Sequence, residues 1–139
     1  MSYKIIGKYI KDLNFSIPNP KTFFLLSKDI EKYKINIDIK SNQVKQNIIE
    51  VLISLNLIPT AENFDKINTK IIFATIIQLS DDKIKKEEIE KIILVKVPSQ
   101  IYGELRKIFV NLFENSGFKD IKISENVDFL KLYTMKKAQ

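Results

Sequence analysis

The sequence has 139 residues, of which 45% are hydrophobic and 29% are charged, as is typical of one folded domain with its own core. It contains no cysteine and no histidine, which excludes disulfides, thiolate nucleophiles, cysteine-ligated metals and the commonest general base near neutral pH. The net charge is +6, but Arg106 is the only arginine among the 23 basic residues, so the charge is spread over lysines and forms no arginine-rich surface for nucleic acid.

The first 79 residues contain four segments in which apolar and polar side chains alternate, as they do in half-buried strands. These expected strands are residues 3–17, 33–40, 48–58 and 66–79. Pro18 and Pro20 end the first strand because proline cannot donate a hydrogen bond to a sheet. On the alternation, Tyr9 shares a face with Phe15, and Gly7 marks a bulge.

Two segments connect these strands. Residues 21–33 are expected to form a connection with one helical turn, and residues 41–47, which contain Ser, Asn and Gln, are expected to form a turn.

The spacing of apolar residues changes to a helical period after Ser80. Residues 81–95 predict a short charged helix that runs into an extended apolar stretch. Pro98 occupies a position where a helix can begin, and Ser116-Gly117 predicts its end. A last short helix lies within residues 126–137, with Asn126 or Asp128 as its cap.

Strands followed by helices predict an α+β fold. We expect a four-stranded antiparallel sheet with a long and a short C-terminal helix packed on one face, in a single domain of residues 1–139.

The sequence carries no recognisable catalytic or metal-binding pattern. Its three glycines form no phosphate loop. The carboxylates between Asp81 and Glu90 interleave with lysines, as on a solvated helix face. We therefore expect a protein that is not an enzyme and that needs no cofactor or metal. The absence of a long apolar run or signal peptide favours the cytoplasm.

The strands carry more apolar residues than one covered face requires. If the other face is open, it exposes a patch that favours an oligomer interface or a binding groove. Burial of the same residues by loops is the alternative. The patch residues are Ile6, Ile10, Ile48, Leu52, Ile58, Ile72 and Ile76.

Three stretches resemble the SecB family of protein-export chaperones. "YIKDLNFSIPNP" (9–20) is similar to the Tyr-x-Lys-Asp pattern of its first strand, with the later Phe and Pro in register. "VPSQIYGELR" (97–106) keeps Pro98 and the arginine of the long helix, although Val97, Gly103 and Glu104 depart from the family pattern. "GFKDIKISENVDFLKLY" (117–133) is similar to the C-terminal segment.

The resemblance implies an ATP-independent chaperone that holds unfolded polypeptides and assembles as a dimer or a dimer of dimers. It also implies delivery of these clients to the SecA motor, for which Asp12 stands at an acidic docking position. The client-binding candidates are the aromatic residues Tyr9, Phe15, Phe23, Phe24, Phe73, Phe109 and Phe113, for each of which a place in the core is the alternative.

Two departures leave other roles open. The family is acidic whereas this chain is basic, and Ser16 and Lys70 stand where docking carboxylates lie in the family. Relatives that serve antitoxins in toxin–antitoxin modules offer one alternative role. A small basic nucleic-acid-binding protein is the other, on charge alone.

Overall fold

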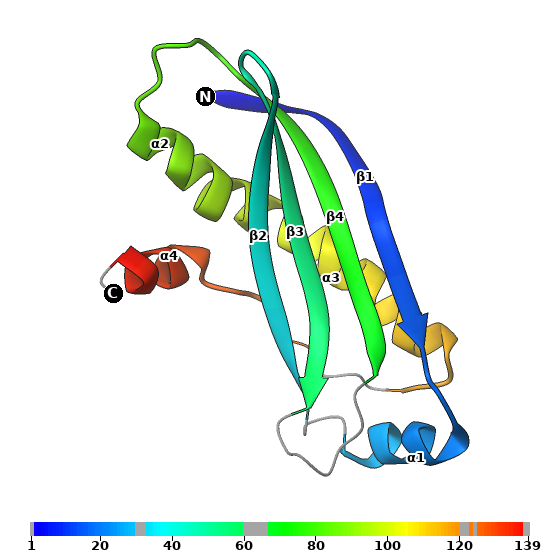
Figure 1. Ribbon diagram of the computed structural model, residues 1–139. Coiled ribbons are helices and arrows are strands. Elements are labelled where there is room, and N and C mark those ends of the chain that lie inside the picture. The colour runs from blue at the N-terminus through cyan, green and yellow to red at the C-terminus, as the bar shows by residue number, and fades with distance from the viewer. Residues whose placement is uncertain (1, 30–32, 60–66, 120–122, 124, 138–139) are drawn as a thin grey trace.

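The computed structural model describes residues 2–29, 33–59, 67–119, 123 and 125–137 (Figure 1). Its elements are β1 (Tyr3–Ser16), α1 (Pro20–Asp29), β2 (Tyr33–Lys45), β3 (Ile48–Pro59), β4 (Asn68–Leu79), α2 (Lys86–Lys91), the π-helical turn η2 (Ile92–Lys96), α3 (Val97–Asn115) and α4 (Phe129–Lys137). The strands form one antiparallel sheet in the order β1-β4-β3-β2. The predicted fold class is therefore confirmed.

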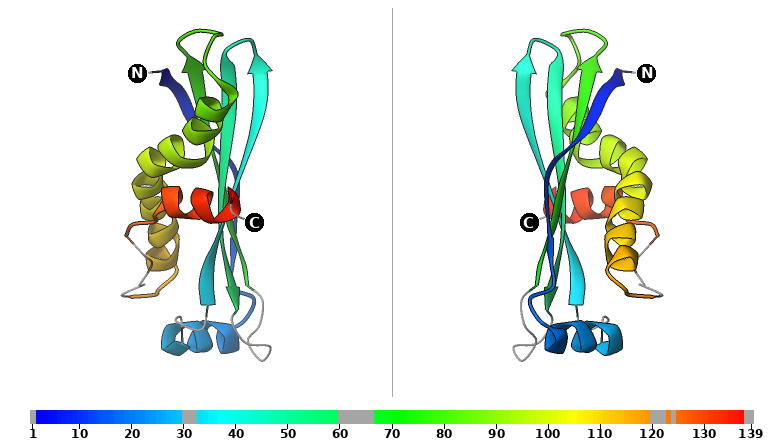
Figure 2. Two further views of the ribbon diagram at one scale, coloured as in Figure 1. Left: turned by 90° about the vertical axis from the view of Figure 1, so that its left-hand side faces the viewer. Right: turned by 90° about the vertical axis from the view of Figure 1, so that its right-hand side faces the viewer.

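The sheet has one covered face and one free face. Figure 2 shows α2 and α3 on one side of the strands, and in Figure 1 α3 passes behind the sheet, so that the free face is turned toward the viewer. Directly paired residues of antiparallel strands point to the same face. On β3 the alternation puts Val51, Ile53 and Leu55, each 0% exposed, on the covered face.

The core lies between this covered face and α3. The helix buries residues at spacings of three and four, including Ile101, Leu105, Phe109 and Phe113, and each of them is 0–1% exposed. Burying a side chain of this size stabilises a fold by about 1.5–3 kcal/mol. The amphipathic helix and the alternating strands therefore supply the two halves of one core.

Strand β1 contains two bulges, at Ile6 and Lys11, where the pairing with β4 shifts register. Each bulge reverses the alternation of faces. Between the bulges, Lys8 reaches Glu104 of α3 with its Nζ 3.3 Å from Oε1, whereas Tyr9 points to the free face. The expectation that Tyr9 shares a face with Phe15 was therefore wrong.

Two connections also differ from expectation. Residues 20–29 form a ten-residue helix rather than one turn, because Asn19 caps it: the Thr22 N–H donates to Asn19 Oδ1 at 2.8 Å. Strand β2 continues to Lys45, and the turn shrinks to Gln46 and Asn47. Asn47 takes the left-handed conformation, with φ of 63°, that short hairpin turns require.

The segment before Pro98 is helical, not extended as expected. At η2 the Val97 N–H donates to the Ile92 carbonyl, the wider i to i−5 bond of a π turn. Proline lacks an N–H and its ring crowds the carbonyl four residues earlier. The π turn accommodates both effects, so that α2, η2 and α3 follow one another without a break.

The end of α3 confirms the predicted cap. Gly117 has φ of 96°, the Phe118 N–H donates to the Phe113 carbonyl, and the Gly117 N–H donates to the Glu114 carbonyl. This is the hydrogen-bond pattern of a Schellman cap. Beyond it, Arg106 donates from Nε and Nη2 to the Ile123 carbonyl at 3.1 and 3.0 Å, and so fixes the path of the chain toward α4.

Helix α4 is capped by one of the two predicted residues. The Lys131 N–H donates to Asp128 Oδ1 at 2.9 Å, so Asp128 is the cap. The described helices include none with the length and apolar character of a membrane span.

Candidate functional site

Six phenylalanines meet at the end of the sheet where α1 and the C-terminal end of α3 lie (Figure 1). Phe113 is the centre: its ring centroid is 5.0 Å from Phe15, 5.5 Å from Phe109 and 5.6 Å from Phe118. Phe118 in turn lies 4.8 Å from Phe23, and Phe23 lies 5.7 Å from Phe24. We call Phe15, Phe23, Phe24, Phe109, Phe113 and Phe118 the aromatic cluster.

The aromatic cluster runs from the core to the surface. Phe109 and Phe113 are 0% exposed, Phe15 and Phe23 are half-buried, and Phe24 is 68% exposed. Edge-to-face contacts of this kind add about 0.5–1.5 kcal/mol per pair beyond burial. The buried rings therefore hold in place a surface ring that is free to contact another chain.

The Schellman cap of α3 builds the junction within this cluster. By turning the chain sharply at Gly117, it brings Phe118 back against Phe113 and Phe23. Phe118 was not among the predicted site residues, although its place directly after the predicted cap was an available signal.

A second apolar surface lies between the edge strand β2 and α4. It is a groove of about 250 Å³, and we call it the β2–α4 groove. Its lining residues are Ile37, Asp38, Ile39, Leu94, Phe129, Leu132 and Tyr133. Leu132 is 49% exposed, whereas Phe129 is buried and packs on Tyr102 with ring centroids 6.0 Å apart. None of these residues was predicted as a site residue, because the groove forms only when α4 docks.

The remaining predicted aromatic residues lie apart from both surfaces. Phe73 is buried on the covered face of β4, paired with Ile53 and Ile10. Tyr9 is on the free face, 42% exposed, and its hydroxyl donates to the Glu50 carboxylate. The seven predicted residues therefore fall into three places.

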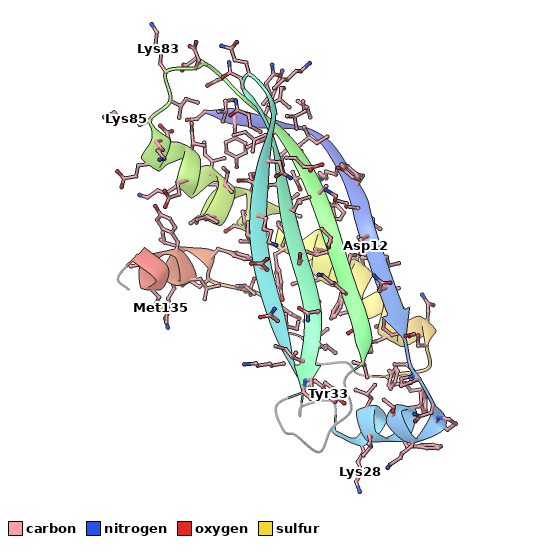
Figure 3. All side chains as sticks on the ribbon, in the orientation of Figure 1. Asp12, Lys28, Tyr33, Lys83, Lys85 and Met135 are labelled. Carbon is pink, nitrogen blue, oxygen red and sulfur yellow. The ribbon has the colours of Figure 1, made fainter. Side chains whose placement is uncertain are left out.

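The free face carries the predicted docking residue. Asp12 is exposed on β1, where Figure 3 labels it, and it accepts a hydrogen bond from Asn14 Nδ2 at 3.2 Å. In the strand pairing, Asp12 lies beside Ile72. Lys70 lies on the same face, paired with Asn14 and Asn56.

Glu50 is the electrostatic centre of the free face. The hydrogen bond from Tyr9 lowers the pKa of the Glu50 carboxyl; burial opposes this effect, and the Lys11 charge adds to it. The Lys11 Nζ lies 3.6 Å from Glu50 Oε1. The same contact with Glu50 raises the pKa of the Tyr9 hydroxyl, because losing the donated proton would place two negative charges together.

These surfaces offer apolar contacts, hydrogen bonds and charge to a binding partner. Within the described residues, no three acidic side chains gather in a way that could hold a metal ion. The covered side presents apolar and aromatic surface. The free face presents an ion pair among lysines, amides and aliphatic side chains.

Comparison with known proteins relates the whole chain to one family. The family described as "Preprotein translocase subunit SecB" matches residues 1–139. The "Putative protein-export protein SecB" of Pelagibacter ubique is 41% identical over 132 residues, which cover 95% of this chain and 94% of that protein. The "Protein-export protein SecB" of Anaplasma phagocytophilum is 24% identical over 98% of this chain and 93% of that protein.

A solved structure shares the fold. It is a SecB-like chaperone of Mycobacterium tuberculosis, in complex with a peptide from the HigA1 antitoxin. The two chains superpose with a TM-score of 0.64 at 12% identity, over 91% of this chain and 88% of the other.

Proposed function

This chain belongs to the SecB family, and on that premise we propose that it holds unfolded polypeptides, without ATP, against the aromatic cluster and the β2–α4 groove. Family membership makes it a chaperone of protein export that binds client polypeptides. We infer the client-binding surfaces, the oligomer and the delivery step from the structure of this chain.

The observation that carries the proposal is the exposed end of the aromatic cluster. Phe24 is 68% exposed on a helix whose Leu26 is 0% exposed, so the ring stands on a rigid support. Apolar surface removed from water contributes about 25 cal/mol per Å² whatever the client's sequence. A ring held in place therefore gives affinity for many unfolded chains without specificity for one.

Strand β2 offers a second means of holding a client. It is an edge strand of the sheet, and it pairs with β3 without a bulge from Tyr33 to Gln43. Its outer N–H and C=O groups are available to an extended chain, as in strand addition. Ile37 and Ile39 line the β2–α4 groove directly beside that edge, so one client segment can use both.

We also propose that the chain assembles with copies of itself through β1, the other edge strand. Four large side chains on this strand are exposed: Ile6, Tyr9, Ile10 and Leu13, at 42–48%. A row of exposed apolar residues on a long edge strand is a liability in a monomer. A dimer or a dimer of dimers covers it.

We further propose that the protein delivers its clients to SecA in the cytoplasm. Asp12 is exposed and available for docking. Lys70 is exposed on the same face, and a positive charge beside an acidic docking residue weakens attraction to a basic partner. We therefore expect weaker docking than an all-acidic face would give.

The proposal is tested by client binding in solution. Fluorescein-labelled α-lactalbumin, reduced and carboxymethylated so that it stays unfolded, is titrated with the protein while anisotropy is recorded. We expect binding without nucleotide, and weaker binding after Phe24→Ser or Leu132→Ser. The matched control is Thr134→Ser, on the exposed surface of α4, which should bind like the natural sequence. Equal binding by all four proteins would refute the assigned surfaces, and no binding would refute client holding.

A further inference from the structure

The free face of the sheet, which is turned toward the viewer in Figure 3, contains an open hollow that shares only Ile37 and Asp38 with the β2–α4 groove. The hollow measures about 470 Å³ and crosses all four strands. Its lining residues are Lys11, Asn36, Ile37, Asp38, Lys40, Leu52, Ser54, Asn56, Lys70 and Ile72. We propose that this hollow docks an acidic segment of a partner protein, one that carries an apolar side chain between two carboxylates.

The floor of the hollow is apolar. Leu52 on β3 and Ile72 on β4 are half-buried, and Ala74, which pairs with Leu52, is 0% exposed. An aliphatic side chain of a docked segment therefore has a place to bury. Burying a leucine-sized group contributes about 1.5–3 kcal/mol, too little for stable docking without help from charge.

The rim of the hollow is positive. Three lysines line it against one carboxylate, Asp38, and Lys11 is already paired with Glu50. Lys40 and Lys70 are exposed, and neither has a carboxylate partner within the described residues. These two ammonium groups are the unmatched charges of the hollow, and a carboxylate is the group that complements them.

The two free lysines stand on opposite sides of the apolar floor. Lys40 pairs with Leu52, and Lys70 pairs with Asn56, four residues further along β3. Strand geometry separates these levels by about 13 Å along the strands, and the two strand spacings between β2 and β4 add about 10 Å across. An extended segment with acidic side chains four residues apart spans about 13 Å, and the long lysine side chains cover the remainder.

Two other occupants fit less well. A second copy of this chain would place lysines against lysines, which repel. Nucleic acid is usually bound through arginine forks and stacking aromatics. The described lining has neither, and its floor is aliphatic. Beside this floor, Asn36 Nδ2 donates to Asn56 Oδ1 at 3.2 Å, and such amide groups suit hydrogen bonds with peptide groups.

The test uses the full chain and a short synthetic peptide, Gly-Glu-Ser-Leu-Ser-Glu-Gly, with a matched peptide in which lysine replaces both glutamates. Binding is followed by amide chemical shifts, which also locate the site, and affinity is measured at about 50 and 300 mM salt. We expect the amides of Lys40, Leu52 and Lys70 to shift with the acidic peptide. Affinity should fall at the higher salt concentration, because salt screens exposed charges.

Matched variants separate local charge from net charge. The double change Lys40→Glu and Lys70→Glu should lower the affinity for the acidic peptide by about tenfold or more. Lys83→Glu with Lys85→Glu makes the same change in net charge in the loop before α2 (Figure 3), and should alter affinity by less than about twofold.

Three outcomes would overturn the proposal. They are equal binding of the lysine peptide, shifts confined to α1 and α4, and no binding at millimolar peptide. An oligothymidylate is the comparison ligand for nucleic acid. If it binds more tightly than the acidic peptide, and if the double change Lys40→Glu and Lys70→Glu abolishes its binding, the hollow is a nucleic-acid site instead. The β2–α4 groove shares Ile37 and Asp38 with the hollow, but Phe24 and Leu132 line only the client surfaces, and Lys40 and Lys70 line only the hollow. Variants at these two pairs of residues therefore let client binding and acidic-segment binding fail separately.

Discussion

Single residues hold the aromatic cluster in place, and Gly117 is the clearest of them. Its φ of 96° is a conformation that side chains with a Cβ rarely adopt. The sharp turn there returns Phe118 to Phe113 and Phe23. The requirement is therefore one of backbone conformation rather than space, since a Cβ at this position would meet Phe23 at an ordinary 3.5 Å.

We predict that Gly117→Ala destabilises the protein by about 1–2 kcal/mol, the cost of a left-handed residue with a Cβ. The control is Gly103→Ala, because a Cβ at Gly103 in α3 meets nothing within 4 Å. That change should stabilise the protein by about 0.5–1 kcal/mol. Urea unfolding measures both free energies of unfolding, and a similar effect of the two substitutions would contradict this assignment.

Glu50 predicts a pH dependence of stability. Its pKa is lowered in the folded protein from an ordinary 4.5, chiefly by the hydrogen bond from Tyr9. A carboxyl with a lowered folded pKa stabilises the fold above its ordinary pKa, and this contribution is lost as the pH falls through the lowered value. Glu50→Gln should therefore cost up to about 1 kcal/mol at pH 7, and less near pH 3.

The same measurement has an internal control. Tyr9→Phe removes the donor that lowers the Glu50 pKa most. In that background, Glu50→Gln should therefore show much less dependence of its cost on pH. Urea unfolding at pH 7 and near pH 3 measures the free energy of unfolding of each variant. A cost of Glu50→Gln that is the same at both, in the otherwise natural sequence, would show that the lowered pKa contributes no stability.

Among the helices and strands, those with a regular spacing of apolar residues were predicted correctly from the sequence. The alternation in β3 and the helical spacing in α3 placed both elements, and Ser116-Gly117 and Asp128 were found as caps. Helix α1 was underestimated because Pro18 and Pro20 were interpreted only as stops. Proline is also favoured in the first turn of a helix, and Asn19 before it is a good cap.

Other features depend on tertiary contacts that no local pattern shows. The bulges at Ile6 and Lys11 moved Tyr9 to the free face, and only the pairing with β4 defines them. The β2–α4 groove brings together three distant segments. The seven aromatic candidates were chosen by residue type, which cannot separate Phe113 in the core from Phe24 at the surface.

Because some rings of the aromatic cluster are buried and others are exposed, we expect their substitution to cost different amounts of stability. Phe113→Ala removes a ring that is 0% exposed and should cost about 3–5 kcal/mol. Phe24→Ala removes one that is 68% exposed and should cost within about 0.5 kcal/mol. Thermal unfolding of the two variants compares them. A large loss of stability from Phe24→Ala would place that ring in the core and remove it as a client contact.

At the scale of the whole molecule, the chain has one covered sheet face and two edge strands with different characters. Strand β2 pairs without a bulge from Tyr33 to Gln43 and borders the β2–α4 groove, whereas β1 has two bulges and carries exposed apolar residues. We assign β2 to clients and β1 to sister chains. The free face carries Asp12, which we assign to SecA, and the hollow with Lys40 and Lys70, which we assign to an acidic segment.

This assignment predicts an oligomer that depends on β1. Sedimentation equilibrium should give a mass that is a multiple of the 16.2 kDa chain. Ile10→Glu with Leu13→Glu should shift it toward one chain, since both residues are more than 40% exposed and the new charges would repel across a β1 interface. A natural sequence that sediments as a monomer at all concentrations would exclude the proposed assembly.

The central claim is that apolar surface on a stable fold grips unfolded chains. Chemically denatured citrate synthase, diluted into buffer without nucleotide, aggregates and scatters light. We predict that the protein suppresses this scattering in proportion to its concentration, and that the double change Phe24→Ser and Leu132→Ser loses most of the effect while the fold stays intact. Unchanged scattering at a several-fold molar excess of the natural sequence would contradict the account.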